Sequence, residues 1–147
     1  MGKKIIIIED NPADAKTLRV ALARRDPEIE TMVLDDGVRA IEFFTHSLLD
    51  EETEPADLVL LDLNLPIVSG FEVLEFLKSD PQLRKLPVVV LSGSSSQHEI
   101  ERCYAAGANS YMCKPTGIQQ VFDMAVQLIT YWFDHAKLPK SFATTHR

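Results

Sequence analysis

The chain has 147 residues, 46% of them hydrophobic and 25% charged, and a formal net charge of −7 at pH 7. This length suffices for one domain with a full core, and the composition is that of an ordinary globular protein. The acidic balance disfavours nonspecific binding to nucleic acid or to an anionic membrane surface. No apolar stretch is long enough to span a bilayer. From the charge and the lack of such a stretch, we expect neither a nucleic-acid-binding protein nor a membrane protein.

The beginning of the chain and its cysteines both favour a cytoplasmic protein. Only four isoleucines follow Lys4, too short an apolar run for a signal peptide. Cys103 and Cys113 lie in largely apolar sequence, where a free cysteine packs as a small hydrophobe instead of forming a disulfide. We therefore expect a cytoplasmic protein without a disulfide framework.

Strand-like and helix-like segments alternate five times along the chain. Short apolar or β-branched runs predict strands at 5–8, 30–34, 58–61, 88–91 and 110–113. Each run is followed by residues with helical spacing or a helix-start signal, beginning near Pro12, Val38, Phe71, Ile100 and Ile118. Helical crossovers between successive strands give a parallel sheet with helices on both faces, so the pattern predicts a doubly wound (βα)5 domain.

The last helix and the residues after it define the end of this domain. An apolar stripe runs along the helix through Ile118, Val121, Phe122, Ala125, Ile129 and Trp132. We predict that residues 1–135 form the domain with an extended C-terminal helix and that residues 136–147 form a polar tail. A second apolar set comprises Met124, Leu128, Tyr131 and Phe133. Because a helix that is apolar nearly all round is buried on more than one side, this set outside the core stripe could pack under the tail or against a second subunit. We expect a homodimer through this region, since an exposed apolar patch of that size indicates a partner.

Polar residues follow four of the five predicted strands. They are Glu9 and Asp10 after the first, Asp62 after the third, Ser92 after the fourth and Lys114 after the fifth. The carboxyl ends of parallel strands share one edge of the sheet, where open α/β folds place their ligand chemistry. We therefore expect these side chains to converge.

Three carboxylates in one small site repel each other, and Lys114 supplies only one positive charge. A divalent cation would supply the rest, and oxygen ligands without His or Cys favour Mg²⁺. This chemistry suits phosphoryl transfer onto a carboxylate, with Asp62 as the nucleophile. Taken singly, the same residues have structural explanations: Asp62 or Ser92 could hold a turn, and Asp10 could help to cap a helix.

Four motifs in order resemble the receiver domain of two-component response regulators. They are Ile-Glu-Asp-Asn ending at residue 11, Leu-Asp-Leu-Asn-Leu-Pro ending at residue 66, Leu-Ser-Gly around Ser92 and Cys-Lys-Pro around Lys114. The spacings from Asp62 to Ser92 and from Ser92 to Lys114 are also similar to those of the family. The resemblance covers residues 3–135 and implies a flavodoxin-like, five-stranded sheet in the order 2-1-3-4-5.

The resemblance also implies a role for each residue of the site. Asp62 would accept a phosphoryl group from the phosphohistidine of a sensor histidine kinase or phosphotransfer protein. Asp10 would bind Mg²⁺ directly, Glu9 through water, and Asn64 through its backbone carbonyl.

The remaining implied roles concern the response to phosphorylation. Ser92 would hydrogen-bond the phosphoryl group, and Lys114 would pair with it. Tyr111 would be a switching aromatic that follows Ser92, although an aromatic residue in a strand is more often part of the core. Pro115 would follow a cis peptide bond.

A narrower resemblance is to the single-domain regulators paired with bacterial phytochromes. It rests on the acidic segment 50–54, the Leu-Asp-Leu-Asn-Leu-Pro motif around Asp62 and the aromatic run 131–133. Because no output domain follows in the sequence, we expect a single-domain regulator that catalyses only its own phosphorylation and dephosphorylation.

Three other functions remain open at this point. A phosphatase of the haloacid-dehalogenase type also uses a strand-end aspartate with Mg²⁺, but Asn64 stands where that family has an acid. A pseudo-receiver would leave the site unused, whereas the acids, Ser92 and Lys114 are all present. A flavodoxin-like cofactor protein would need a phosphate loop where Glu9 and Asp10 stand. His46, His98, His135 and His146 have no context that suggests a phosphocarrier or metal site.

Overall fold

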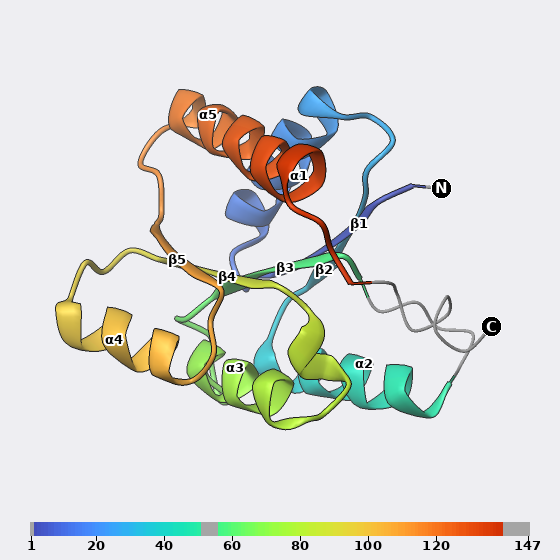
Figure 1. Ribbon diagram of the computed structural model, residues 1–147. Helices are drawn as coiled ribbons and strands as arrows, with labels where there is room; N and C mark the ends of the chain where they lie inside the picture. Colours follow the sequence, from blue (N-terminus) through green and yellow to red (C-terminus); the bar gives the residue numbers. More distant parts are fainter. Residues whose placement is uncertain (1, 51–55, 140–147) are drawn as a thin grey trace.

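The computed structural model describes residues 2–50 and 56–139 and contains one parallel sheet (Figure 1). Its strands are β1 (Lys4–Ile8), β2 (Glu30–Leu34), β3 (Leu58–Asp62), β4 (Val88–Ser92) and β5 (Ser110–Cys113). They pair in the order β2-β1-β3-β4-β5, which confirms the predicted order. β3 therefore lies at the centre of the sheet, between β1 and β4.

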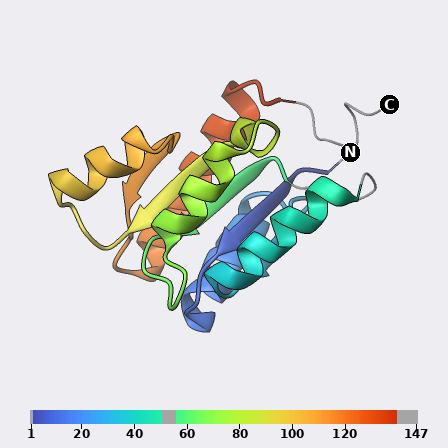
Figure 2. The same ribbon diagram turned by 90° about the horizontal axis from the view of Figure 1, so that it is seen from below.

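Helices cover both faces of this sheet. They are α1 (Pro12–Arg25), α2 (Gly37–Leu49), α3 (Gly70–Ser79), α4 (Gln97–Ala105) and α5 (Ile118–Ile129), with a short 3-10 turn at Leu83–Lys85. α1 and α5 pack together on one face, while α2, α3 and α4 lie on the other (Figures 1 and 2). Each of these helices is too short or too polar to cross a lipid bilayer.

The apolar strands are explained by two cores, one on each face of the sheet. Ile6 and Ile8 of β1 pack with α2 and α3, whereas Ile5 and Ile7 pack with α1 and α5. All four isoleucines are buried. A strand covered on both faces reads as a continuous apolar run, which is why β1, β3 and β4 show no alternation.

The loops that carry the functional edge are held by local hydrogen bonds. Asn11 caps α1 by accepting from the backbone N–H groups of Ala13 and Asp14, and Pro12 opens the helix. Ser69 and Glu72 form a reciprocal capping box at the start of α3. Gly70 lies so close to the backbone of Asp62 that a Cβ atom would overlap it. The start of α3 is thus packed directly against the end of β3.

The C-terminal helix differs in part from the predicted pattern. After α5 the chain continues as a π-helical segment, Thr130–His135. Met124 and Leu128, predicted to lie outside the core stripe, are buried in the core, while Ile118, predicted in that stripe, is 70% exposed. The division was wrong because α5 packs against both α1 and the sheet, which covers a wider arc than one stripe. Residues 140–147 of the predicted tail and 51–55 of the acidic loop lie outside the described residues.

The two cysteines have different environments. Cys103 is the buried residue of α4 and packs in the core, as expected for a small hydrophobe. Cys113 is exposed at the end of β5, so its assignment to the core was wrong. It stands on the edge strand, which has a neighbour on one side only.

Candidate functional site

The carboxylates that follow β1 and β3 meet at the carboxyl edge of the sheet. β1 and β3 pair with Ile8 opposite Leu61, so the residues that follow them are adjacent. One carboxylate oxygen each from Glu9, Asp10 and Asp62 lies within 4.8 Å of the other two. Glu9 and Asp62 are buried, whereas Asp10 is exposed. The three carboxylates therefore converge, as their positions at the strand ends predicted.

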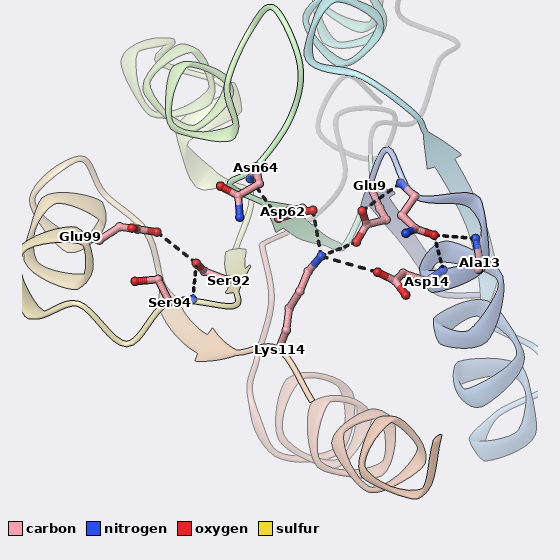
Figure 3. A network of polar contacts seen from close by, with 10 residues as sticks. Glu9, Ala13, Asp14, Asp62, Asn64, Ser92, Ser94, Glu99 and Lys114 are labelled. Atoms are coloured by element: carbon pink, nitrogen blue, oxygen red, sulfur yellow. Dashed lines mark hydrogen bonds and ion pairs between the residues drawn. The ribbon is translucent and has the colours of Figure 1, made fainter. Parts of the chain in front are cut away.

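Lys114 reaches into this cluster from the loop after β5 (Figure 3). Its Nζ atom lies 2.9 Å from Glu9 Oε1 and 2.9 Å from Asp62 Oδ2, with Asp14 Oδ2 farther away at 3.9 Å. The backbone N–H of Lys114 donates to the carbonyl of Ser92 at 2.7 Å. Lys114 is thus held by its backbone against β4 and by its ammonium against the two buried acids.

This geometry has clear electrostatic consequences. Burial raises the pKa of Glu9 to about 7, although hydrogen bonds from Lys114 and from the Asn11 backbone oppose the shift. Burial would lower the pKa of Lys114, but the carboxylates of Glu9 and Asp62 outweigh it and raise that pKa above its ordinary value. Lys114 therefore carries a full positive charge at neutral pH, while Glu9 is divided between its charged and neutral forms.

The donor set fits a hard divalent cation. Its three acidic side chains offer carboxylate oxygens, and no His or Cys stands among them. Lys114 alone leaves an excess of negative charge when all three are ionised. A divalent cation held by these three acids would balance that excess and supply positive charge for an anionic ligand at the cluster.

Asp62 is positioned by the backbone that follows it. Its Oδ1 atom accepts a hydrogen bond from the backbone N–H of Asn64 at 3.0 Å, while Oδ2 faces Lys114. Asn64 itself is exposed beside the site. The carboxylate is therefore oriented by one bond from its own loop and one from the opposite side of the cluster.

Ser92 lies at the end of β4, next to β3, but its hydroxyl faces α4 (Figure 3). The side chain is fully buried, and Oγ donates to Glu99 Oε1 at 3.0 Å while it accepts from the Ser94 N–H at 3.1 Å. The Tyr111 hydroxyl donates to the carbonyl of Ser94 at 2.9 Å and lies 3.3 Å from Glu99 Oε1. Both predicted switch residues thus contact Glu99.

Sequence reasoning missed Glu99. It is the third residue of α4, where an acid three positions after the capping Ser96 is commonly a helix-start residue. Its contact with Ser92 depends on the path of the loop at residues 93–96, which brings α4 back to the end of β4. The only available signal was an acid seven positions after Ser92, which indicates nothing without that path.

Two other expectations about the site have definite outcomes. The described residues contain no cis peptide bond, so the cis bond expected before Pro115 was wrong. Lys114 is placed instead by the hydrogen bond of its backbone N–H to Ser92. His46, His98 and His135 are exposed, and His146 lies outside the described residues.

Comparisons with known proteins agree with this geometry. The sequence profile of the response regulator receiver domain matches residues 5–126. Response regulator Rcp1 from Synechocystis sp. is 32% identical over 137 residues, which cover 93% of each chain. Among solved structures, the phosphorylated cyanobacterial phytochrome response regulator RcpA is similar with a TM-score of 0.88 and 36% identity, covering 95% of this chain and 100% of that one.

A second solved structure bears on the cation. The Mn²⁺-bound form of Rcp1 is similar with a TM-score of 0.84 and 32% identity, covering 94% of this chain and 99% of that one. The haloacid-dehalogenase and flavodoxin-like interpretations find no support in these relationships. The profile match and the identity to Rcp1 together show that the chain belongs to the response regulator receiver domain family.

Proposed function

We propose that this protein is a Mg²⁺-dependent phosphoacceptor switch in which Asp62 receives a phosphoryl group from the phosphohistidine of a sensor histidine kinase or phosphotransfer protein. The observation that carries the proposal is the placement of Asp62. It is buried at the end of the central strand, 2.9 Å from Lys114 and within the acidic cluster.

The transfer requires little of the protein beyond position and charge. An Asp62 carboxylate oxygen attacks phosphorus, the phosphorus–nitrogen bond of the donor breaks, and the imidazole leaves with the bonding electron pair. Lys114 is already positively charged and within reach of Asp62, so it can pair with the transferred group without a proton transfer.

The proposed cation ligands differ in how free their oxygens are. Both oxygens of Glu9 already accept hydrogen bonds, one from Lys114 and one from the Asn11 backbone. Asp10 is exposed, which favours direct ligation by Asp10 and contact through water for Glu9. Asp62 and the backbone carbonyl of Asn64 complete the proposed protein ligands, and the all-oxygen set favours Mg²⁺.

Phosphorylation would change the surface formed by α4, β5 and α5. Ser92 would turn its hydroxyl toward the phosphoryl group, and Tyr111 would move with it. A charge-assisted hydrogen bond contributes about 1.5–3 kcal/mol, which shifts a two-state equilibrium by roughly ten- to a hundredfold. Such a shift suits a graded switch of a protein-interaction face.

The partners follow from the relatives and from the exposed surface. RcpA is a phytochrome response regulator, and a phytochrome-type histidine kinase is therefore the proposed donor for this chain. Exposed Ile118, Val126 and Tyr131 near the C-terminal helix are the proposed contacts of a homodimer. We place this regulator in the cytoplasm, acting through protein contacts and catalysing only its own phosphorylation and dephosphorylation.

Intact mass spectrometry after incubation with acetyl phosphate and Mg²⁺ tests the proposal. The parent chain should gain one phosphoryl group, and Asp62→Asn should gain none. Asp57→Asn is the matched control, because Asp57 precedes β3 at the opposite edge of the sheet, where it accepts from the backbone of Lys4. Labelling of Asp62→Asn at the parent level would refute the proposed phosphoacceptor.

A further inference from the structure

Glu99 connects the two residues that are proposed to move on phosphorylation. A single atom, Glu99 Oε1, accepts the hydroxyl proton of Ser92 at 3.0 Å and lies 3.3 Å from the hydroxyl of Tyr111 (Figure 3 shows the contact with Ser92). Glu99 is half-buried, so its bonds are shielded from water on one side. It lies outside the acidic cluster of Glu9, Asp10 and Asp62.

The Ser92 hydroxyl has only one proton to donate. In this structure that proton is directed to Glu99, while the lone pairs of Oγ accept from the Ser94 N–H. To donate to a phosphoryl group on Asp62, Ser92 must break its bond to Glu99. A hydrogen bond from a hydroxyl to a carboxylate is charge-assisted, so the bond that must break belongs to the stronger class of hydrogen bonds.

The carboxylate of Glu99 also contacts Tyr111. Burial raises the pKa of Tyr111, and the nearby charge of Glu99 acts in the same direction, so the phenol remains a donor at neutral pH. Its stronger hydrogen bond goes to the Ser94 carbonyl at 2.9 Å. Ser94 therefore contacts Ser92 through its N–H and Tyr111 through its carbonyl, with Glu99 closing the network.

We propose that Glu99 is a positioning residue that holds the Ser92 hydroxyl away from the phosphorylation site and so sets the threshold of the switch. This inference rests on the proposed phosphoacceptor function of Asp62. Glu99 competes with the phosphoryl group for one proton, and its contact with Tyr111 couples that competition to the surface of α4 and β5. Weakening the competitor favours the state in which Ser92 faces Asp62.

Beryllofluoride, an anionic mimic of an aspartyl phosphate, provides the test on the full chain with Mg²⁺. Titration is followed by 19F NMR of protein labelled with 3-fluorotyrosine, with the Tyr111 signal assigned from Tyr111→Phe. Glu99→Gln keeps the shape but replaces a charged acceptor with a neutral one. We expect half-saturation at a beryllofluoride concentration about five- to tenfold lower than in the parent, the difference between the two classes of hydrogen bond.

Two controls separate positioning from a general effect of charge. Glu101→Gln removes the same charge from an exposed position of α4 and should leave the midpoint within about twofold of the parent. In a Ser92→Ala background, Glu99→Gln should have no further effect, because the proton under competition is gone. Glu99→Asp keeps the charge and should remain nearer to the parent than Glu99→Gln.

Each outcome decides the inference. An unchanged midpoint in Glu99→Gln overturns it, as does an equal shift in Glu101→Gln or a shift that persists without Ser92. A parent chain that shows no Asp62-dependent response to beryllofluoride overturns both the inference and the proposed function. If the parent responds to beryllofluoride and Glu99→Gln has the same midpoint as the parent, only the inference about Glu99 is overturned.

Discussion

Two partly buried lysines at opposite edges of the sheet show how differently this fold uses the same side chain. At the carboxyl edge, the ammonium of Lys114 is paired with two buried carboxylates, Glu9 and Asp62. At the amino edge of β4, the ammonium of Lys78 donates to three neutral oxygens, the carbonyls of Arg84 and Leu86 and the side chain of Asn109.

The charge balance of the two places explains the difference. The neighbours of Lys78 that accept its hydrogen bonds carry no formal charge, and burial lowers its pKa to about 8. The pKa of Lys114 is raised, because the acids outweigh burial, and negative charge remains in excess around it. Lys78, with neutral acceptors, links α3 to the turn after it and to the residue before β5. Lys114, among acids, has the surroundings that the proposed anionic ligand and cation require.

The largest effect should come from Lys114. Lys114→Gln removes the positive charge beside Asp62, so phosphorylation by acetyl phosphate should slow by about a hundredfold or more, by analogy with the loss of one charge-stabilising donor. Lys78→Gln should leave that rate unchanged. Initial rates of phosphorylation from intact mass spectrometry distinguish the two lysines. An equal loss of rate in both variants would contradict the difference in role between Lys114 and Lys78.

Cation binding should be the next largest effect. Mg²⁺ should raise the melting temperature of the parent, because the cation binds the folded cluster and not the unfolded chain. Asp10→Asn should weaken Mg²⁺ binding by at least about tenfold, since it removes a proposed direct ligand. Asp26→Asn changes a half-buried acid that follows α1, outside the acidic cluster, and is the matched control for isothermal titration calorimetry. Normal binding by Asp10→Asn would exclude Asp10 as a ligand.

Lys78 should matter for stability instead. Lys78→Met leaves carbonyls of Arg84 and Leu86 without their donor, which should lower the free energy of unfolding by about 1–2 kcal/mol. Urea denaturation at constant salt measures this change. A loss of phosphorylation with no loss of stability would reverse the roles assigned to the two lysines.

The smallest effect concerns pH. Because the pKa of Glu9 is raised to about 7 in the folded protein, its proton favours folding at low pH, and this contribution is lost as pH rises through about 7. Without a cation, stability should therefore fall slightly across neutral pH, and Glu9→Gln should flatten that slope. Mg²⁺ must displace the same proton, so its binding should tighten over the same range.

Glu28→Gln, which changes an exposed acid before β2, should retain the slope. Melting curves at several pH values in a metal-free buffer provide the comparison. An identical slope in Glu9→Gln and the parent would show that another group is responsible.

The contrast between the two lysines also shows what the sequence could predict. Lys114 follows a strand, and strand ends meet at one edge by topology, so its place beside Asp62 could be inferred before any coordinates. Lys78 lies in α3, and its acceptors come from the turn after that helix and from the residue before β5. The contact of Lys78 with these acceptors depends on the paths of the loops, which the spacing of apolar residues does not predict.

The same limit explains the other differences. Met124 and Leu128 were wrongly assigned to a position outside the core. Helical spacing predicts which residues share a face of the helix, but it does not predict how many faces pack against other elements. The peptide bond before Pro115 depends on how the loop closes, which sequence position alone does not determine. Glu99 meets Ser92 only through the loop between β4 and α4.

The most direct test of the account is to locate the phosphoryl group itself. The chain is incubated with acetyl phosphate and Mg²⁺, treated with borohydride to reduce the acyl phosphate to a stable homoserine, and mapped by peptide mass spectrometry. The account predicts conversion at Asp62 that requires both the donor and Mg²⁺. Conversion at Asp10 or another acid, or conversion at Asp62 that is equally efficient in excess chelator, would contradict it.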